Sequence, residues 1–450
     1  MILWIAATLI GMGALAWAFR YAGQQITNQA PKFRDMPFGV AYGYVLAAFC
    51  LGWLVWAYMQ GRSSDLATAN KFFFLRIGIE GFIIFAIAAY LFRLAGRSIG
   101  TAWTRKMFRE MPLTAAFGIL IILIYAFVAI FAGQIPAKFI AYSASLGLIL
   151  CIGLFLVGAP EKRVQAIGIV AVAFALTLAM YFIGPIAPYG QEQIIPGVAA
   201  NITPGGDPAL GGNPDFPLGT DQIGRDILSR LIYGAQNTVG IAFATTFLAF
   251  LLGGTFGFLA ATFGGWLDQI LSRMVDVLMA IPSLIFALLL MTIASVWAPR
   301  LGIPLTVFMV LIIAVIDSTR VFRLSRAVGQ NIVVMDYIEA AKLRGEGFGY
   351  IIFKEILPNA TAPLLAEFGL RFCFVFLTIA ALSFLGVGIQ PPLADWGTMV
   401  RDLAGFVNYA QFAPMAATAP LLAAGAIALL TVAVNFVVDW MLHKSSGLKE

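Results

Sequence analysis

The amino-acid sequence predicts an all-α polytopic membrane protein, and two features of its composition point to that class. Of its 450 residues, 61% are hydrophobic and only 11% are charged, whereas soluble domains contain about 25% charged residues. So few charged side chains cannot cover the surface of a water-soluble globule. The apolar residues also gather in runs of roughly 20, the length of a membrane-spanning helix. We expect about 11 such helices and no large soluble domain.

The first region, 1–92, is predicted to be an N-terminal extension of about three transmembrane helices. Its apolar runs cover 2–19, 38–59 and 72–92. In the third run Arg76 and Glu80 stand one helical turn apart, so their charges can neutralise each other.

The next region, 93–136, combines a basic amphipathic stretch with a first core helix at 113–132. Its Arg and Lys residues alternate with bulky apolar ones, which is typical of a helix on the cytoplasmic membrane surface. Segment 322–362 and the tail 441–450 are also basic, so the same orientation places them inside and the N-terminus outside.

The remaining regions continue this pattern of apolar runs. A transmembrane hairpin is predicted within 137–187, followed at 188–235 by a Pro/Gly-rich periplasmic loop and a short helix. Five further runs form a core over 236–440. These runs cover 238–263, 275–296, 303–321, 364–387 and 414–438.

Catalytic and metal sites are not indicated. The single histidine, His443, excludes a His-Glu-x-x-His zinc site and argues against a Ser-His-Asp triad. Cys50, Cys151 and Cys373 lie in or beside apolar runs, and we interpret them as small buried hydrophobes. The chain has no Gly-x-x-x-x-Gly-Lys-Ser/Thr phosphate loop, so we expect that it does not hydrolyse ATP by itself.

Segment 330–358 is polar and helix-forming, and it lies between two apolar runs. Residues 339–343 favour a helix, the glycines that follow should break it, and a second short helix is expected over 350–357, stopped by Pro358. The resulting helix-turn-helix suits docking into a groove of another protein. Unless a partner covers them, we expect five apolar side chains to be exposed there: Ile338, Leu343, Phe348, Ile351 and Ile352.

The same segment resembles a known signature. Glu339-Ala-Ala-x-x-x-Gly345, followed after nine residues by Glu355-Ile-Leu-Pro358, is similar to the EAA motif of bacterial ABC importer membrane subunits. The resemblance implies a coupling helix that sits in a cleft of the ATPase subunit. The implied coupling residues are Glu339, Ala340, Ala341, Gly345, Ile351, Leu357 and Pro358. Glu355 departs from the pattern, which prefers an apolar residue there.

A second stretch, 218–234, resembles the segment before the second core helix of dipeptide and oligopeptide importer permeases, as do 263–268, 386–392 and Trp396-Gly397. It points to the C-type of the two paired permeases. The residues implied for a periplasmic gate segment are Gly219, Thr220, Asp221, Gly224, Arg225, Asp226, Arg230 and Gly234. From the residues themselves, Thr220 or Asp221 can cap a helix. Asp221 with Arg225, and Asp226 with Arg230, are spaced for i,i+4 pairs along it.

The resemblance implies a type I ABC importer transmembrane fold with extra N-terminal helices and an inserted helical hairpin, in the bacterial inner (plasma) membrane. The implied partners are a second permease, two subunits that bind ATP and Mg, and a periplasmic solute-binding protein, with no cofactor in this chain. Peptides are the implied cargo, although related permeases move nickel complexes and sugars. The extension 1–92 has no counterpart in the family pattern. We interpret it as a packing layer, with partner binding as the alternative.

Charged and small residues within the apolar runs are candidates for the transport path. Asp317 with Arg320, and Glu367 with Arg371, stand one turn apart near the expected cytoplasmic ends of their runs. We interpret both as structural ion pairs rather than substrate contacts. Six small residues are candidates for the pore lining, and close helix packing is the alternative for the glycines. They are Thr245, Thr246, Gly253, Gly254, Gly257 and Ser383.

Two other classes of function fit the sequence less well than a transport subunit. A secondary active transporter needs binding residues near the bilayer midplane and an inverted repeat. The sequence shows no clear repeat, and its charges are expected near helix ends. An intramembrane enzyme is disfavoured because the sequence lacks a histidine or paired-aspartate constellation.

Overall fold

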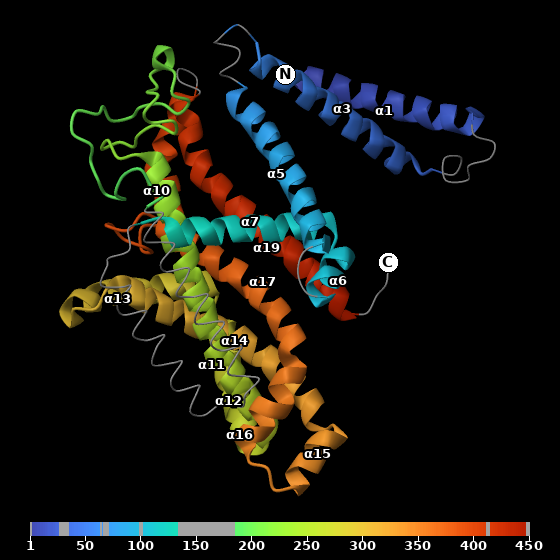
Figure 1. Cartoon of the computed structure of the whole chain (residues 1–450), viewed down its shortest axis with the longest axis vertical. Helices are drawn as coiled ribbons and strands as arrows, with labels where there is room; N and C mark the ends of the chain where they lie inside the picture. The colour runs from blue at the N-terminus through green and yellow to red at the C-terminus, as the bar shows by residue number, and fades with distance from the viewer. Residues whose placement is uncertain are drawn as a thin grey trace. The chain divides into compact units, whose positions relative to one another are not determined.

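The computed structural model describes residues 2–26, 36–63, 65, 72–98, 102–133, 185–410 and 415–446. Within this part of the chain the regular structure is helical, apart from isolated bridges in the loop between Ile194 and Asp226 (Figure 1). The predicted all-α class is confirmed.

Eight of the described helices are long and apolar enough to cross a membrane. They account for eight of the predicted runs. The run 2–19 lies in a further helix, α1 (Ile2–Ile26), which is not among those eight. The runs 139–158 and 167–186 fall, up to residue 184, outside the described residues.

Residues 1–85 form the first of two compact units. It contains α1, α3 (Phe38–Gly61) and the first part of α5 (Phe73–Ser98). Ala16 and Ala41 are fully buried, because their small side chains let α1 and α3 approach closely. The predicted contact of Arg76 with Glu80 is present at 4.0 Å, and the Tyr58 hydroxyl donates to Glu80 at 3.2 Å.

The second unit, residues 86–450, carries the core. Its α-helices are α6 (Ala102–Glu110), α7 (Leu113–Phe131), α10 (Ile227–Gly234), α11 (Gly240–Phe263), α12 (Gly265–Ala280), α13 (Ser283–Leu301), α14 (Leu305–Val333), α15 (Asp336–Leu343), α16 (Phe348–Tyr350), α17 (Leu357–Phe384), α18 (Trp396–Leu403) and α19 (Ala419–Ser446). Two π-helical turns, Ala235–Val239 and Ile351–Ile356, join α10 to α11 and α16 to α17. Short 3-10 turns cover Pro208–Leu210, Ala404–Tyr409 and Ala416–Thr418.

The two ends of the predicted insertion meet at the end of α7. The Ile186 amide donates to the Phe131 carbonyl at 3.0 Å, and the Ala187 amide donates to the Ala132 carbonyl at 3.4 Å. The chain after the predicted insertion therefore resumes beside the C-terminal end of α7. The hairpin predicted within 137–187 lies largely outside the described residues and stays a prediction.

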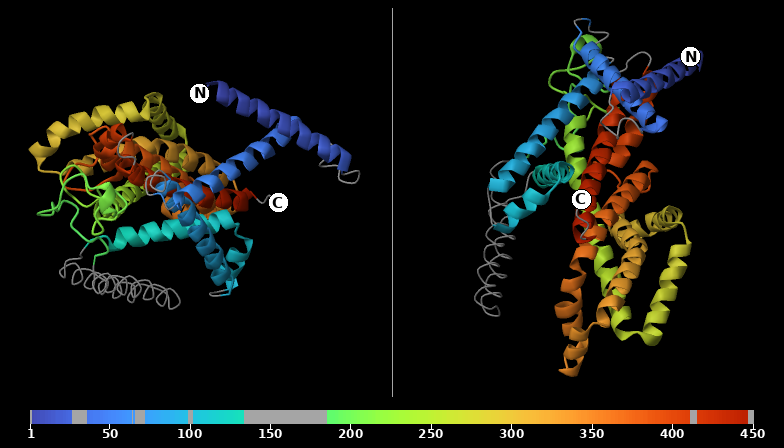
Figure 2. Two further views of the ribbon diagram at one scale, coloured as in Figure 1. Left: turned by 90° about the horizontal axis from the view of Figure 1, so that it is seen from above. Right: turned by 90° about the vertical axis from the view of Figure 1, so that its right-hand side faces the viewer.

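Helices α11 and α14 pack along each other, and small residues make this possible (Figure 2). A Cβ atom on Gly253 would lie 2.4 Å from the Ser318 carbonyl oxygen, and one on Gly257 would lie 2.7 Å from the Ser325 Cβ. Neither position has room for a side chain, so the packing alternative for these glycines is correct.

The other pore-lining candidates also face the interior of this chain. Thr245 and Thr246 are fully buried, and their hydroxyls donate to carbonyls of their own helix. The Ser383 hydroxyl is buried and accepts from the Ile389 amide at 3.0 Å. Of the six candidates, only Gly254 is not buried. The expectation of a pore lining is therefore wrong for the others, because helix contacts within the chain already cover them.

Two predicted spans have different boundaries. The run 275–296 is divided, because Ile281 adopts an extended conformation before Pro282, as residues before proline prefer. The predicted end of the run 303–321 is too early, since α14 continues to Val333. The polar C-terminal part of α14 is held by contacts with other helices, which the length of an apolar run does not reveal. Arg323 binds Asp276 at 2.6 Å, and Gly329 packs against Ala261.

Pro358 does not stop the helix, contrary to the prediction. The π-helical turn Ile351–Ile356 runs directly into α17, which contains Pro358 in its first turn and Pro363 inside it. A proline ring clashes with the carbonyl four residues earlier in a regular α-helix. The wider π-turn before Pro358 relieves that restriction, so one long helix leads from the elbow into the core.

We expect Gly253→Ala to destabilise the core, because its Cβ would collide with the backbone of α14. The expected loss in unfolding free energy is about 1–3 kcal/mol, measured by thermal unfolding of the purified protein in detergent. Gly254→Ala is the matched control, since the nearest atom to its Cβ is the Ser325 hydroxyl at 4.0 Å. Alanine there should be neutral or stabilising by up to about 1 kcal/mol. Equal effects at the two positions would contradict this account of the packing.

Candidate functional site

The first candidate site is the elbow between α14 and α17, formed by α15, the turn at Gly345 and α16. Gly345 has a φ of +81°, a conformation that suits glycine. Its amide donates to the Lys342 carbonyl at 2.9 Å, and the Glu346 amide donates to the Ala341 carbonyl at 3.2 Å. These two bonds form a Schellman motif, which ends α15 and reverses the chain.

One face of the elbow is packed against the core, which corrects part of the predicted exposure. Ile338 and Ile351 are buried in a cluster that includes Phe258 of α11, and Ala341 is buried as well. The prediction that these two isoleucines are exposed is wrong, because α11 and the end of α14 cover them. Ile352 is partly buried.

The opposite face of the elbow is exposed and apolar. Leu343 and Phe348 are exposed as predicted, at 83% and 50%. Phe353 adds to this face at 67% exposure. Of the seven predicted coupling residues, Ala341 and Ile351 are buried and the other five are exposed. The exposed five are Glu339, Ala340, Gly345, Leu357 and Pro358.

Ion pairs and ring contacts attach the elbow region to α11 and α12. Arg326 of α14 makes a two-pronged contact with Asp268, whose second bond is 2.6 Å long. Hydrogen bonding from Arg326 lowers the pKa of the Asp268 carboxyl. The Phe263 and Phe348 rings stack with centroids 4.2 Å apart. Sequence spacing missed these pairings, because the partners come from different helices.

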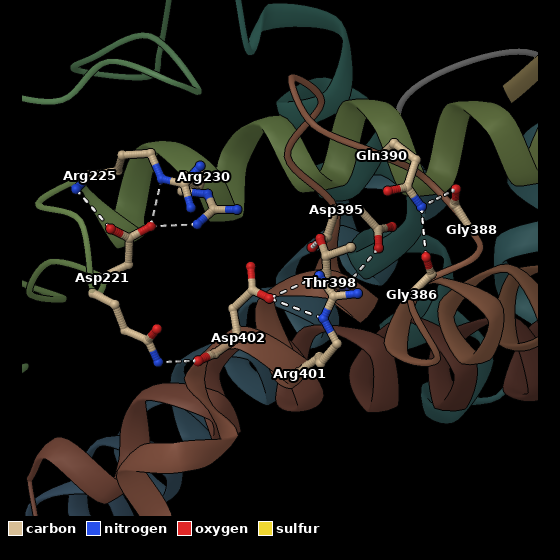
Figure 3. A network of polar contacts seen from close by, with 11 residues as sticks. Asp221, Arg225, Arg230, Gly386, Gly388, Gln390, Asp395, Thr398, Arg401 and Asp402 are labelled. Carbon is tan, nitrogen blue, oxygen red and sulfur yellow. Dashed lines mark hydrogen bonds and ion pairs between the residues drawn. The ribbon is translucent and has the colours of Figure 1, made fainter. Parts of the chain in front are cut away.

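The predicted gate segment lies in the loop-rich region before α10, and Asp221 is its centre (Figure 3). The Asp221 carboxylate accepts from the Arg225 side chain at 2.7 Å and from Arg230 at 2.5 Å. Burial by itself would raise the pKa of Asp221. Hydrogen bonds from Arg225 and the charges of Arg225 and Arg230 outweigh that effect, and the pKa is lowered.

Two details of the predicted segment are wrong. The helix begins at Ile227, and Asp226 caps it by accepting from the Ser229 amide at 2.8 Å. Because Asp226 is engaged there, Arg230 pairs with Asp221 instead. The Asp221–Arg225 pair forms as predicted, but in a turn rather than along a helix.

The other residues of the segment shape the loop. Thr220 accepts from the Ile202 amide and donates to the Ala199 carbonyl, each at 3.0 Å. Gly219 and Gly224 have positive φ values, and a Cβ on Gly219 would lie 2.2 Å from the Ile202 carbonyl oxygen. A Cβ on Gly234 would collide with the Trp396 ring. These glycines allow the loop to close against the rest of the unit.

Asp395 is a buried polar residue that sequence reasoning missed. Its side chain accepts from the Thr238 hydroxyl at 2.7 Å and from the Thr398 amide at 2.9 Å, so it caps α18 and joins it to the π-helical turn that precedes α11. Burial raises the pKa of the Asp395 carboxyl, although hydrogen bonds from Thr238 and Thr398 act in the opposite direction. An aspartate just before a helix is a recognisable capping signal, which could have identified it.

The predicted intramembrane pairs both form, and the structure joins them into one cluster. Asp317 lies 3.5 Å from Arg320, and Arg371 lies 2.7 Å from Glu367. Asp317 also lies 3.7 Å from Arg371, so α14 and α17 are connected. Asp317 lies 12 residues after Leu305, the first residue of α14, which corresponds to about 18 Å along the helix. Both helices extend beyond their apolar runs, so the cluster lies away from the helix ends, and its expected place near the cytoplasmic ends of the membrane spans stays a prediction.

A cavity of about 220 Å³ lies beside this cluster, between α13, α14 and α17. Its wall includes the polar residues Ser283, Asp317, Arg320 and Thr378. Asp317 is only 5% exposed. Its Oδ2 atom is buried with no hydrogen-bond partner among the described residues.

Comparison with known proteins adds to this geometry. Residues 253–444 match the family of the binding-protein-dependent transport system inner membrane component. The chain is 36% identical over 256 residues to the dipeptide transport system permease protein DppC of Haemophilus influenzae, covering 56% of this chain and 81% of that protein. It is 37% identical over 282 residues to DppC of Escherichia coli, covering 62% of this chain and 87% of that protein. It is 32% identical over 224 residues to the glutathione transport system permease protein GsiD of Pectobacterium atrosepticum, covering 49% of this chain and 69% of that protein.

These relatives are permease proteins of transport systems, and the long apolar helices of this chain fit that class of membrane protein. This chain belongs to the dipeptide and oligopeptide permease family of ABC importers. It is a permease subunit with the type I importer fold, a multi-pass protein of the bacterial inner membrane that works together with other subunits. The family provides the membrane channel component, not the ATPase. Nothing in these relatives supports the secondary-transporter alternative.

We expect Asp221→Asn to destabilise the loop region, because the buried Arg230 would lose the carboxylate that it binds directly. At pH 7 the loss in unfolding free energy should be about 3–5 kcal/mol. The pKa of Asp221 is lowered in the folded state, so its contribution is complete above its unfolded value of about 3.9 and is lost as pH falls through the folded value. Thermal unfolding of variant and parent should therefore converge in acid. Asp215→Asn, on an exposed residue of the same loop, is the control, and a pH-independent difference would refute this account.

Proposed function

We propose that this permease forms half of a translocation pathway for di- or oligopeptides, with a second permease as the other half. The names of its relatives support this cargo, since they are permeases for dipeptides, di- and tripeptides, and glutathione. In this proposal a periplasmic solute-binding protein delivers the peptide. Two partner subunits bind ATP and Mg, and this chain needs no cofactor of its own.

The exposed face of the elbow is the observation that carries the coupling role. Leu343 and Phe353 are more than 60% exposed on a projection whose other face is packed. Exposed apolar side chains on a rigid projection favour docking into a partner's groove. The partner that we propose is the ATP-binding subunit. In this arrangement Glu339, Ala340 and Gly345 meet the partner, and the buried Ala341 and Ile351 hold the elbow in position.

The helices on either side of the elbow give it a mechanical connection to the core. It is attached directly to α14 on one side and, through the π-helical turn, to α17 on the other. The Asn359 side chain donates to the Tyr337 hydroxyl at 3.2 Å, which joins the two sides. A push on the elbow would therefore move α14 and α17 together, and these helices carry the charged cluster.

We propose that the loop region around Asp221 forms the periplasmic gate segment and faces the solute-binding protein. Its hydrogen bonds connect three parts of the chain. The Gln222 side chain donates to the Asp402 carbonyl at 2.7 Å, and the Trp396 indole donates to the Leu231 carbonyl at 2.9 Å. These hydrogen bonds would make α10 and α18 move together with the loop region.

The coupling proposal predicts that Gly345→Ala separates ATP hydrolysis from uptake. A residue with a side chain at φ +81° costs roughly 1–2 kcal/mol, which would change the shape of the elbow and reduce peptide uptake roughly fivefold or more. ATPase activity and uptake would be measured on the complex reconstituted in vesicles with its binding protein.

Gly349→Ala is the matched control for this experiment, because Gly349 lies on the same elbow without a positive φ and with open space around its Cβ position. Uptake that stays proportional to ATP hydrolysis in Gly345→Ala would count against the coupling role. A wild-type complex that hydrolyses ATP but takes up no di- or oligopeptide would count against the cargo.

A further inference from the structure

We propose that the cavity between α13, α14 and α17 is a contact site for cargo, in which Asp317 receives the ammonium group of a peptide. This inference rests on the proposed peptide cargo. It begins from the free oxygen of Asp317. Oδ1 faces both Arg320 and Arg371, whereas Oδ2 is buried and has no donor in the described part of the chain.

A buried carboxylate oxygen without a donor is costly, so a ligand that donates hydrogen bonds would stabilise it. Arg371 lies 3.7 Å from Oδ1 and 2.7 Å from Glu367, and no described residue donates a hydrogen bond to Oδ2. Charged residues inside the membrane face protein or a water-filled space and commonly mark substrate paths. The cavity beside Asp317 gives this charge a space with a partly polar wall.

The charges around the cavity select a dipolar ligand. Two carboxylates and two guanidinium groups balance each other in the cluster, so neither a simple anion nor a bare cation is favoured by net charge. A hard metal ion requires several oxygen ligands, and the described residues contain no group of three or more candidate ligands. A peptide end offers an ammonium group for Asp317 and a carbonyl or carboxylate for Arg320, whose side chain is 42% exposed and lines the same cavity.

The size of the cavity fits the end of a peptide. A volume of about 220 Å³ holds several water molecules at roughly 30 Å³ each. Ile313 and Phe374 provide apolar wall beside the polar residues. The site therefore accepts different side chains while it recognises the amino end that all linear peptides share.

The first test places a cysteine on the cavity wall as Thr378→Cys, with Cys50, Cys151 and Cys373 replaced by alanine, in the assembled importer. The rate of modification by aminoethyl methanethiosulfonate, which carries an ammonium group, is divided by the rate with neutral methyl methanethiosulfonate. Asp317→Asn should lower this ratio about tenfold, the value of one hydrogen bond to a charged group.

Asp276→Asn is the control, because it removes a carboxylate that pairs with α14 through Arg323 but neither lines the cavity nor contacts Arg371. Its ratio should remain that of the parent. The inference is overturned if Asp317→Asn leaves the ratio unchanged, or if Asp276→Asn lowers it equally, since net charge would then be the cause.

A second measurement keeps Asp317 intact and so does not depend on the stability of an Asp317 variant. In the Thr378→Cys protein, alanyl-alanine should slow modification of the introduced thiol by the neutral reagent, whereas propionyl-alanine, which lacks the amino group, should not. Equal protection, or none, by the two compounds would overturn the inference. Failure of the wild-type complex to take up any peptide would instead reject the proposed function, and the reagent ratio at the introduced thiol would still report on the cavity.

Discussion

The close approach of α11 and α14 is the contact on which the core of this permease depends. Gly253 and Gly257 bring the two backbones together at a distance that leaves no space for a Cβ atom. In a membrane, helices gain little from hydrophobic burial against one another, so close packing through small residues is a main source of association. This contact positions α14, and α14 carries both the charged cluster and the first side of the elbow.

Polar groups are then placed where the packed helices can satisfy them. Asp221 and Asp395 are buried in the loop-rich region, each with two or more donors. Asp268 and Arg326 hold α12 against the end of α14. Asp317 differs from all of these, because one of its oxygens is left without a donor among the described residues, beside a cavity. That difference separates a residue that only stabilises the fold from one that is available to a ligand.

The elbow combines rigidity with an exposed apolar face. Its inner residues, Ile338 and Ile351, are packed as tightly as the core, while Leu343 and Phe353 remain exposed. A flexible projection would absorb a push from a partner, whereas a packed one transmits it to α14 and α17. The π-helical turn before Pro358 makes this possible, since it keeps the second side of the elbow continuous with α17.

The sequence by itself determined the helical membrane class, the family resemblance and the ends of α3, α7 and α11 to within two residues. It also determined the local ion pairs Asp221–Arg225 and Glu367–Arg371, because these depend on residues about one turn apart. Only the tertiary structure decided which residues meet across helices: Arg230 with Asp221, Arg371 with Asp317, and Arg326 with Asp268. It also decided that α14 and α17 extend past their apolar runs, which moved the charged cluster away from the helix ends. Helix length and cross-helix pairing depend on how neighbouring surfaces pack, and a one-dimensional pattern of apolar and polar residues does not contain that information.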